Sequence, residues 1–96
     1  MTCFSLSKPA EADIAAIATY SIERFGLAQA RHYRDELIKT FRILSENPFL
    51  GQDCQEIKAG YRRHVHGRHV IYYRVDDSQI VILRILHERQ DPLRNL

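Results

Sequence analysis

Apolar and small residues recur every three or four positions in the first half of the chain, a spacing that places them along one face of a helix. The first such stripe consists of Ile14, Ile17, Ser21 and Phe25. It predicts a helix from Lys8 to Phe25. Ser7 offers a hydroxyl group for the helix N-cap, and Gly26 suits the left-handed conformation that ends many helices.

A second stripe with the same spacing follows. It consists of Ala30, Tyr33, Leu37, Phe41 and Leu44. The corresponding helix is expected to end at Asn47, because Pro48 cannot continue it. Only the short Gly26-Leu27 connection separates the two helices, so we predict an antiparallel helical hairpin.

The pattern changes after Gly60, where β-branched and aromatic residues gather in three runs. We predict strands over residues 61–66, 69–75 and 80–87, joined by short polar turns at 67–68 and 76–79. Short turns between consecutive strands indicate an antiparallel meander. The last strand is apolar on both faces, and we therefore expect it in the interior of the sheet.

The remaining segments complete an α+β architecture. We expect a short strand at residues 3–6, a polar loop at 49–60 and a polar tail at 88–96. The predicted order is β-αα-βββ, with the helical hairpin packed on one face of a small antiparallel sheet. A chain of 96 residues is long enough for one such domain, spanning residues 1–96.

Composition excludes several classes of protein. Apolar residues make up 45% of the chain and charged residues 27%, which is typical of soluble globular proteins. No apolar run approaches the roughly 20 residues that span a bilayer, and we expect neither membrane insertion nor a signal peptide. Cys3 and Cys54 form no metal or disulfide motif, and no glycine-rich phosphate loop is present. We therefore expect a cytoplasmic protein without a cofactor.

Positive charge gathers in the last third of the chain. Residues 61–96 contain seven arginines, no lysine and four acidic residues, although the net charge of the whole chain is only +2. Arginine is suited to bidentate contacts with carboxylates and phosphates, so a macromolecular partner is indicated. Tyr72 and Tyr73 lie among these arginines on opposite faces of one strand, and one of the two is expected in the core.

The histidines raise a metal hypothesis. His64 and His66 share a strand face, and His69 follows the next turn. However, no cysteine or carboxylate lies in register with them across residues 61–75. We expect no metal site, and we interpret these histidines as part of a solvated sheet face.

His87 raises a second hypothesis, because it ends the last predicted strand among arginines. Histidine moves protons near neutral pH, and Arg63 and Arg84 are able to stabilise a pentacovalent phosphorane, as RNA cleavage requires. Alternatively, the arginines pair with acidic groups of the tail or of a partner, and His87 only ends a strand. The spacing of the residues does not decide between the two.

Several short motifs follow one another along almost the entire chain. The N-terminal motifs are Leu6-Ser7, Ala10-Glu-Ala-Asp13, Tyr20, Glu23-Arg-Phe-Gly26, Gln29-Ala30 and Asn47-Pro48, with Gly51 shortly after. The C-terminal motifs are Gly60-Tyr-Arg-Arg63, Gly67-Arg-His-Val-Ile-Tyr-Tyr-Arg-Val75 and Ile82-Leu-Arg-Ile-Leu-His-Glu-Arg-Gln-Asp91. In this order and spacing, they resemble the ParE toxins of the RelE/ParE superfamily of bacterial toxin–antitoxin modules.

The resemblance implies a RelE/ParE-like fold and a toxin that binds and poisons DNA gyrase without catalysis of its own. It also implies a ParD-like antitoxin, a ribbon-helix-helix protein whose C-terminal segment wraps the toxin in a hetero-oligomer. We expect Arg62, Arg63, Arg74 and Tyr72 at the antitoxin contact. The exposed tail residues Arg89, Gln90 and Arg94 are the expected contact with the target.

Two alternatives to gyrase inhibition remain open. RelE-like ribosome-dependent mRNA endonucleases share the fold, and His87, Arg63 and Arg84 would carry that reaction here. Residues 88–96 contain no aromatic residue and the chain has only three lysines, which favours the ParE branch. The other alternative is an inactive remnant that only binds an antitoxin.

Overall fold

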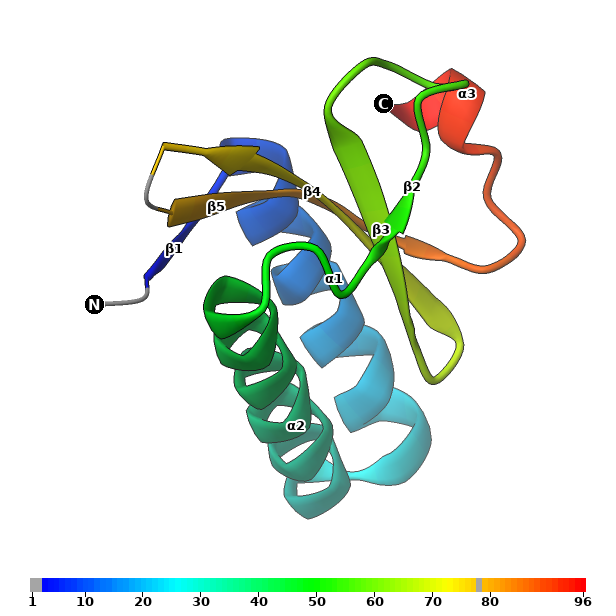
Figure 1. Ribbon diagram of the computed structural model, residues 1–96. Helices are drawn as coiled ribbons and strands as arrows, with labels where there is room; N and C mark the ends of the chain where they lie inside the picture. The colour runs from blue at the N-terminus through cyan, green and yellow to red at the C-terminus, as the bar shows by residue number, and fades with distance from the viewer. Residues whose placement is uncertain (1–2, 78) are drawn as a thin grey trace.

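A helical hairpin packs on one face of a five-stranded sheet in the computed structural model, which describes residues 3–77 and 79–96 (Figure 1). The strand order in the sheet is β1-β5-β4-β3-β2. This arrangement confirms the predicted α+β fold, with the helical hairpin on one face of the sheet. Ser78 of the expected turn lies outside the described residues.

The two long helices have the bounds that their apolar stripes predict. Helix α1 spans Lys8–Phe25, and α2 spans Leu27–Glu46. The Ser7 hydroxyl accepts a hydrogen bond from the backbone N–H of Ala10 at 3.1 Å, and Gly26 between the helices has φ +88°. Among the described residues, no helix combines the length and apolar content that crossing a membrane requires.

The three main strands form the expected antiparallel meander. They are β3 (Tyr61–His66), β4 (His69–Asp76) and β5 (Gln79–His87). Strand β1 (Phe4–Leu6) pairs with the first part of β5 in the parallel direction, so the sheet is mixed rather than wholly antiparallel. A parallel pairing is possible here because the whole helical hairpin connects β1 to the meander.

Two short elements escaped the sequence analysis. Strand β2 (Gln52–Asp53) pairs with β3 inside the segment expected to be a loop. Helix α3 (Pro92–Asn95) ends the polar tail and lies on the side of the sheet away from α2 (Figure 1). Asp91 caps it by accepting a hydrogen bond from the backbone N–H of Leu93 at 2.9 Å. A capping residue followed by proline is a signal that predicts such a turn.

The core is divided between the two faces of the sheet. The main cluster fills the space between helices and sheet, and includes Leu37, Phe41 and Tyr73. A smaller cluster of Cys54, Tyr72 and Leu86 lies apart from it. Consequently both Tyr72 and Tyr73 are buried, although only one of them was expected in the core.

Candidate functional site

The arginines of the last third fall into two groups, and Arg62 belongs to the group that binds its own chain. Its Nε donates to the carbonyl oxygen of Gly51 at 3.0 Å, and its guanidinium lies 5.1 Å from the ring centroid of Phe49. An ion pair with Asp53 at 4.0 Å adds to these contacts. Arg62 therefore holds the segment between α2 and β2 against the sheet.

Arg84 is bound to its own chain even more tightly. Its Nε and Nη2 donate to the two carboxylate oxygens of Asp13 at 2.8 and 2.9 Å, and its Nη1 donates to the carbonyl oxygen of Asn95. The same carboxylate accepts the backbone N–H of Ile85 at 2.9 Å. The hydrogen bonds to Asp13 raise the pKa of Arg84 above its ordinary value. One guanidinium thus joins α1, β5 and the tail.

Arg63 and Tyr72 are neighbours across β3 and β4. The Arg63 side chain is half-buried and donates to Oε1 of Gln52 from both Nε and Nη2 at 3.3 Å. Tyr72 is only 3% exposed, packed with Cys54 and Leu86, and burial raises the pKa of its hydroxyl. Tyr72 therefore packs beside Arg63 on the same face of the sheet and offers little surface of its own.

Arg74 and the tail residues form the accessible group. The side chain of Arg74 is 45% exposed and makes a surface ion pair with Asp76 at 3.7 Å. Arg89, Gln90 and Arg94 are all exposed. Gln90 nevertheless has a structural contact, since its Oε1 accepts the backbone N–H of His87 at 2.8 Å.

The three residues of the endonuclease hypothesis do not converge. Arg63 and Arg84 share a cross-strand row with Tyr72, whereas His87 lies in a row with His66 and His69. Each arginine is three positions from its histidine along the same strand, so the two rows face opposite sides of the sheet.

The histidine face of the sheet is only partly solvated, because α2 covers part of the face that the sequence-based interpretation assigned to solvent. Tyr33 of α2 lies over His66 and His69, with ring centroids at 5.4 and 5.6 Å. The helix covers these positions because its own apolar face must pack on the sheet. Within the described ranges, residues 3–77 and 79–96, no three potential ligands are arranged to hold a metal ion.

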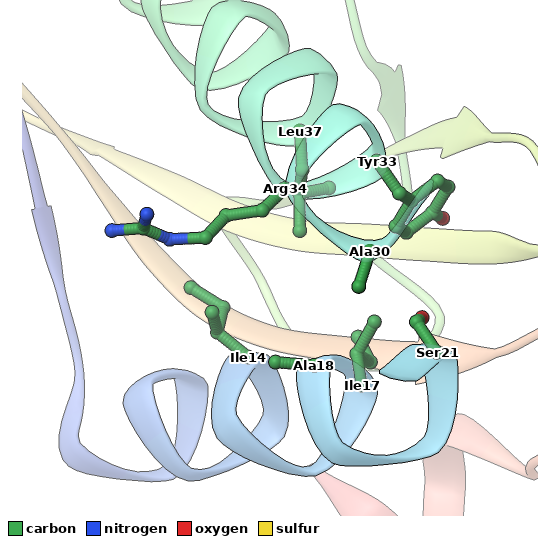
Figure 2. Close-up of a pocket in the computed structure, with 8 residues that line it drawn as sticks. All are labelled: Ile14, Ile17, Ala18, Ser21, Ala30, Tyr33, Arg34 and Leu37. Atoms are coloured by element: carbon green, nitrogen blue, oxygen red, sulfur yellow. The ribbon is translucent and has the colours of Figure 1, made fainter. Parts of the chain in front are cut away.

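A small pocket, with room for about one water molecule, lies between the two long helices (Figure 2). Small and apolar side chains of α1 and α2 line most of it, and Tyr33 and Arg34 come from the α2 side. At the tip of the hairpin, large apolar side chains are exposed. They are Ile22 at 44%, Phe25 at 63% and Leu27 at 52%. The tip of the hairpin therefore presents exposed apolar side chains to a partner.

Comparison with known proteins decides the family. Residues 4–92 match the family model of the ParE toxin of the type II toxin–antitoxin system parDE. The chain is 40% identical to toxin ParE1 of Caulobacter vibrioides over 96 residues, covering 100% of this chain and 99% of that relative. This chain belongs to the ParE toxin family. Toxin ParE1 of Mycobacterium tuberculosis is 37% identical, covering 97% of this chain and 96% of the relative.

Solved structures agree with the fold of this ParE family member. The structure described as the chromosomal ParDE TA system from P. aeruginosa superimposes with a TM-score of 0.78 at 21% identity, covering 91% of this chain and 96% of the other. The toxin–antitoxin complex RelBE2 of Mycobacterium tuberculosis superimposes with a TM-score of 0.63, also at 21% identity, over 90% and 96% of the two chains. The RelE/ParE fold is therefore confirmed.

Sequence reasoning missed one contact of this ParE chain. Asp13 is 71 positions from Arg84, and nothing in the spacing connects them. Only the packing of α1 against β5 brings the two side chains together.

Proposed function

We propose that this ParE toxin inhibits DNA gyrase, blocks replication, and is neutralised by a ParD-like antitoxin in a hetero-oligomer. The observation that carries the proposal is the ParE family match over residues 4–92, together with full-length similarity to toxin ParE1. The separation of His87 from Arg63 and Arg84 is consistent with a toxin that acts by binding rather than by cleaving RNA.

The antitoxin surface that we propose combines an apolar and a charged part. The apolar part is the tip of the helical hairpin, where Ile22, Phe25 and Leu27 offer exposed surface to an amphipathic segment. The charged part is Arg74 with Arg63, which offer charge-assisted hydrogen bonds to carboxylates of the antitoxin. Arg62 and Tyr72 contribute by holding this part of the sheet, since their own side chains are largely covered.

We expect Arg74→Ala to weaken antitoxin binding by about 1 kcal/mol, roughly fivefold in Kd. The side chain is exposed, and its surface ion pair with Asp76 is able to give way to a carboxylate of the antitoxin. Isothermal titration calorimetry with the antitoxin encoded beside the toxin measures this. Arg42→Ala, which removes an exposed arginine near the end of α2 away from the hairpin tip, is a control for the loss of a positive charge. Equal affinities of wild type, Arg63→Ala and Arg74→Ala would remove these arginines from the interface.

We propose the tail as the gyrase contact, because Arg89, Gln90 and Arg94 are exposed outside the packed sheet. The double variant Arg89→Ala/Arg94→Ala is expected to raise the toxin concentration for half-inhibition of supercoiling about 10-fold, because each arginine contributes about 1 kcal/mol or less to binding. The assay contains purified gyrase, relaxed plasmid and ATP. Arg31→Ala/Arg42→Ala, with two exposed arginines of α2 removed, is the matched control.

Three results would count against this function. Supercoiling that stays unaffected at micromolar wild-type toxin contradicts gyrase inhibition. Codon-positioned cuts in translated mRNA that disappear in His87→Gln would support the endonuclease instead. Unimpaired growth on induction in a host without the antitoxin would indicate an inactive remnant.

A further inference from the structure

Three histidines form a continuous row across one end of the sheet. His66 of β3 lies opposite His69 of β4, which in turn lies opposite His87 of β5. The ring centroids of His69 and His87 are 5.8 Å apart, with the rings edge to face. Imidazoles at this distance repel one another when both are protonated.

Two side chains of α2 bind this row from the helix side. The Tyr33 hydroxyl lies 2.6 Å from Nδ1 of His69 and 3.4 Å from the carbonyl oxygen of His66. Thr40 Oγ1 lies 3.1 Å from Nδ1 of His66 and donates its own hydrogen to the carbonyl oxygen of Glu36 at 3.0 Å. Because that hydrogen is committed, Nδ1 of His66 is the donor to Thr40.

These hydrogen bonds persist when His69 gains a proton. In the neutral tautomer whose Nδ1 carries no hydrogen, the Tyr33 hydroxyl donates to Nδ1 of His69. In the charged state, Nδ1–H donates to the Tyr33 oxygen, and the hydroxyl donates to the carbonyl oxygen of His66. The cost of protonation therefore comes from placing adjacent positive charges on partly buried imidazoles beneath α2, not from the breaking of a hydrogen bond.

The surroundings of the row are mixed in charge. Ionisable groups facing His66 and His69 come from α1, α2, β3, β5 and the start of the tail. They are Asp13, Tyr33, Glu36, His64, His87 and Glu88. Burial is the largest influence on both histidines and lowers the pKa of each. The neighbouring imidazoles lower the pKa further, whereas the three carboxylates oppose the change without reversing it.

We propose that His66 and His69 form a pH-sensitive latch between α2 and the sheet, closed while these two imidazoles are neutral and weakened when mildly acidic solution protonates them. The latch lies on the opposite face of the sheet from Arg63 and Arg84. It does not depend on gyrase or on an antitoxin.

The sign of the effect follows from the two states of the chain. In the unfolded chain each imidazole titrates near pH 6.5, whereas in the folded chain it titrates at a lower pH. Between these values unfolding takes up protons, so the stability is fully present above about pH 6.5 and is lost as the pH falls. The unfolding equilibrium constant is expected to rise about 10-fold per pH unit where one imidazole is charged only in the unfolded chain, and about 100-fold where both are.

Denaturant unfolding between pH 7.5 and 5.5 tests the latch on wild type and His66→Asn/His69→Asn. Asparagine keeps a hydrogen-bonding group near each Nδ1 position but does not titrate. We expect the steep dependence to disappear in the double variant and to persist in His32→Gln, an exposed histidine of α2. An unchanged pH dependence in the double variant would overturn the proposal.

A measurement on the unaltered protein keeps the test valid if the double variant does not fold. NMR titration of the imidazole Cε1 protons is expected to give midpoints below 6.5 for both His66 and His69, with faster amide exchange in α2 over the same pH range. Midpoints at or above 6.5 for both histidines would also overturn the latch.

Discussion

Replacing Gly51 by alanine is expected to lower the free energy of unfolding by about 3 kcal/mol, an overpacking cost at the upper end of the usual range. A Cβ at this position would lie 2.7 Å from Cε1 of Tyr73, 2.8 Å from the backbone oxygen of Arg63, and also against the Tyr73 hydroxyl. The backbone oxygen belongs to strand β3, and the Tyr73 side chain is completely buried. Moving either of them away from a new Cβ therefore costs free energy.

The clash of a new Cβ at position 51 would also disrupt a chain of buried hydrogen bonds. The backbone N–H of Gly51 donates to the Tyr73 hydroxyl at 2.9 Å, and that hydroxyl donates to the carbonyl oxygen of Pro48 at 2.8 Å. If the loop moves away, the buried hydroxyl is left without its partners. The same movement would break the hydrogen bond that Arg62 donates to the Gly51 carbonyl oxygen.

Thermal and urea unfolding of Gly51→Ala measure the effect, with a Tm more than about 10 °C below wild type as the expected result for a domain of this size. Gly60→Ala is the control, because Gly60 has φ +84° but open space around a new Cβ. Its cost is expected to be about 1 kcal/mol from backbone strain alone. Equal costs for the two variants would refute the close packing of Gly51 on Tyr73.

The second large effect is expected for Arg84→Met, which should cost about 2–3 kcal/mol. The side chains of Arg84 and Asp13 are 23% and 15% exposed, so removing the guanidinium leaves a largely buried carboxylate without its charged partner. The full penalty of a wholly buried pair is reduced here by partial solvent access. The substitution also removes the hydrogen bond from Arg84 to the Asn95 carbonyl oxygen in the tail.

A double-mutant cycle in urea identifies the cause. Arg84→Met/Asp13→Leu leaves neither charge behind, so its cost is expected to be clearly below the sum of the two single costs. Arg74→Met is the control, since its surface ion pair with Asp76 contributes about 1 kcal/mol or less. Strictly additive costs at Arg84 and Asp13 would contradict a coupled pair.

The sequence did not reveal the features of the fold that depend on contacts between residues far apart in the chain. The helices α1 and α2 were predictable because the apolar stripes and the flanking Ser7 and Gly26 are local signals. The parallel pairing of β1 with β5 is not local, since its partners Phe4 and Ile80 are far apart in the chain. Strand β2 has only two residues, too few for a periodic pattern.

Contacts in the candidate site were likewise not predictable from the sequence, because they join distant parts of the chain. The sequence shows that arginines are concentrated in the last third, but which of them are covered and which are accessible depends on partners elsewhere in the chain. Arg84 hydrogen-bonds to Asp13 in α1, and Arg62 hydrogen-bonds to the carbonyl oxygen of Gly51, whereas Arg74 is exposed. Residue type indicates which side chains are able to bind a partner, and only the fold determines which of them are accessible.

We propose that this ParE toxin acts by binding gyrase and trapping its cleaved DNA. The most direct measurement is the amount of linear plasmid released by protease from reactions with gyrase, ATP and the purified toxin. Linear DNA is expected to accumulate with toxin concentration, and pre-incubation with the ParD-like antitoxin is expected to abolish it. A plasmid that remains uncut and normally supercoiled at toxin concentrations that arrest growth would contradict the proposal.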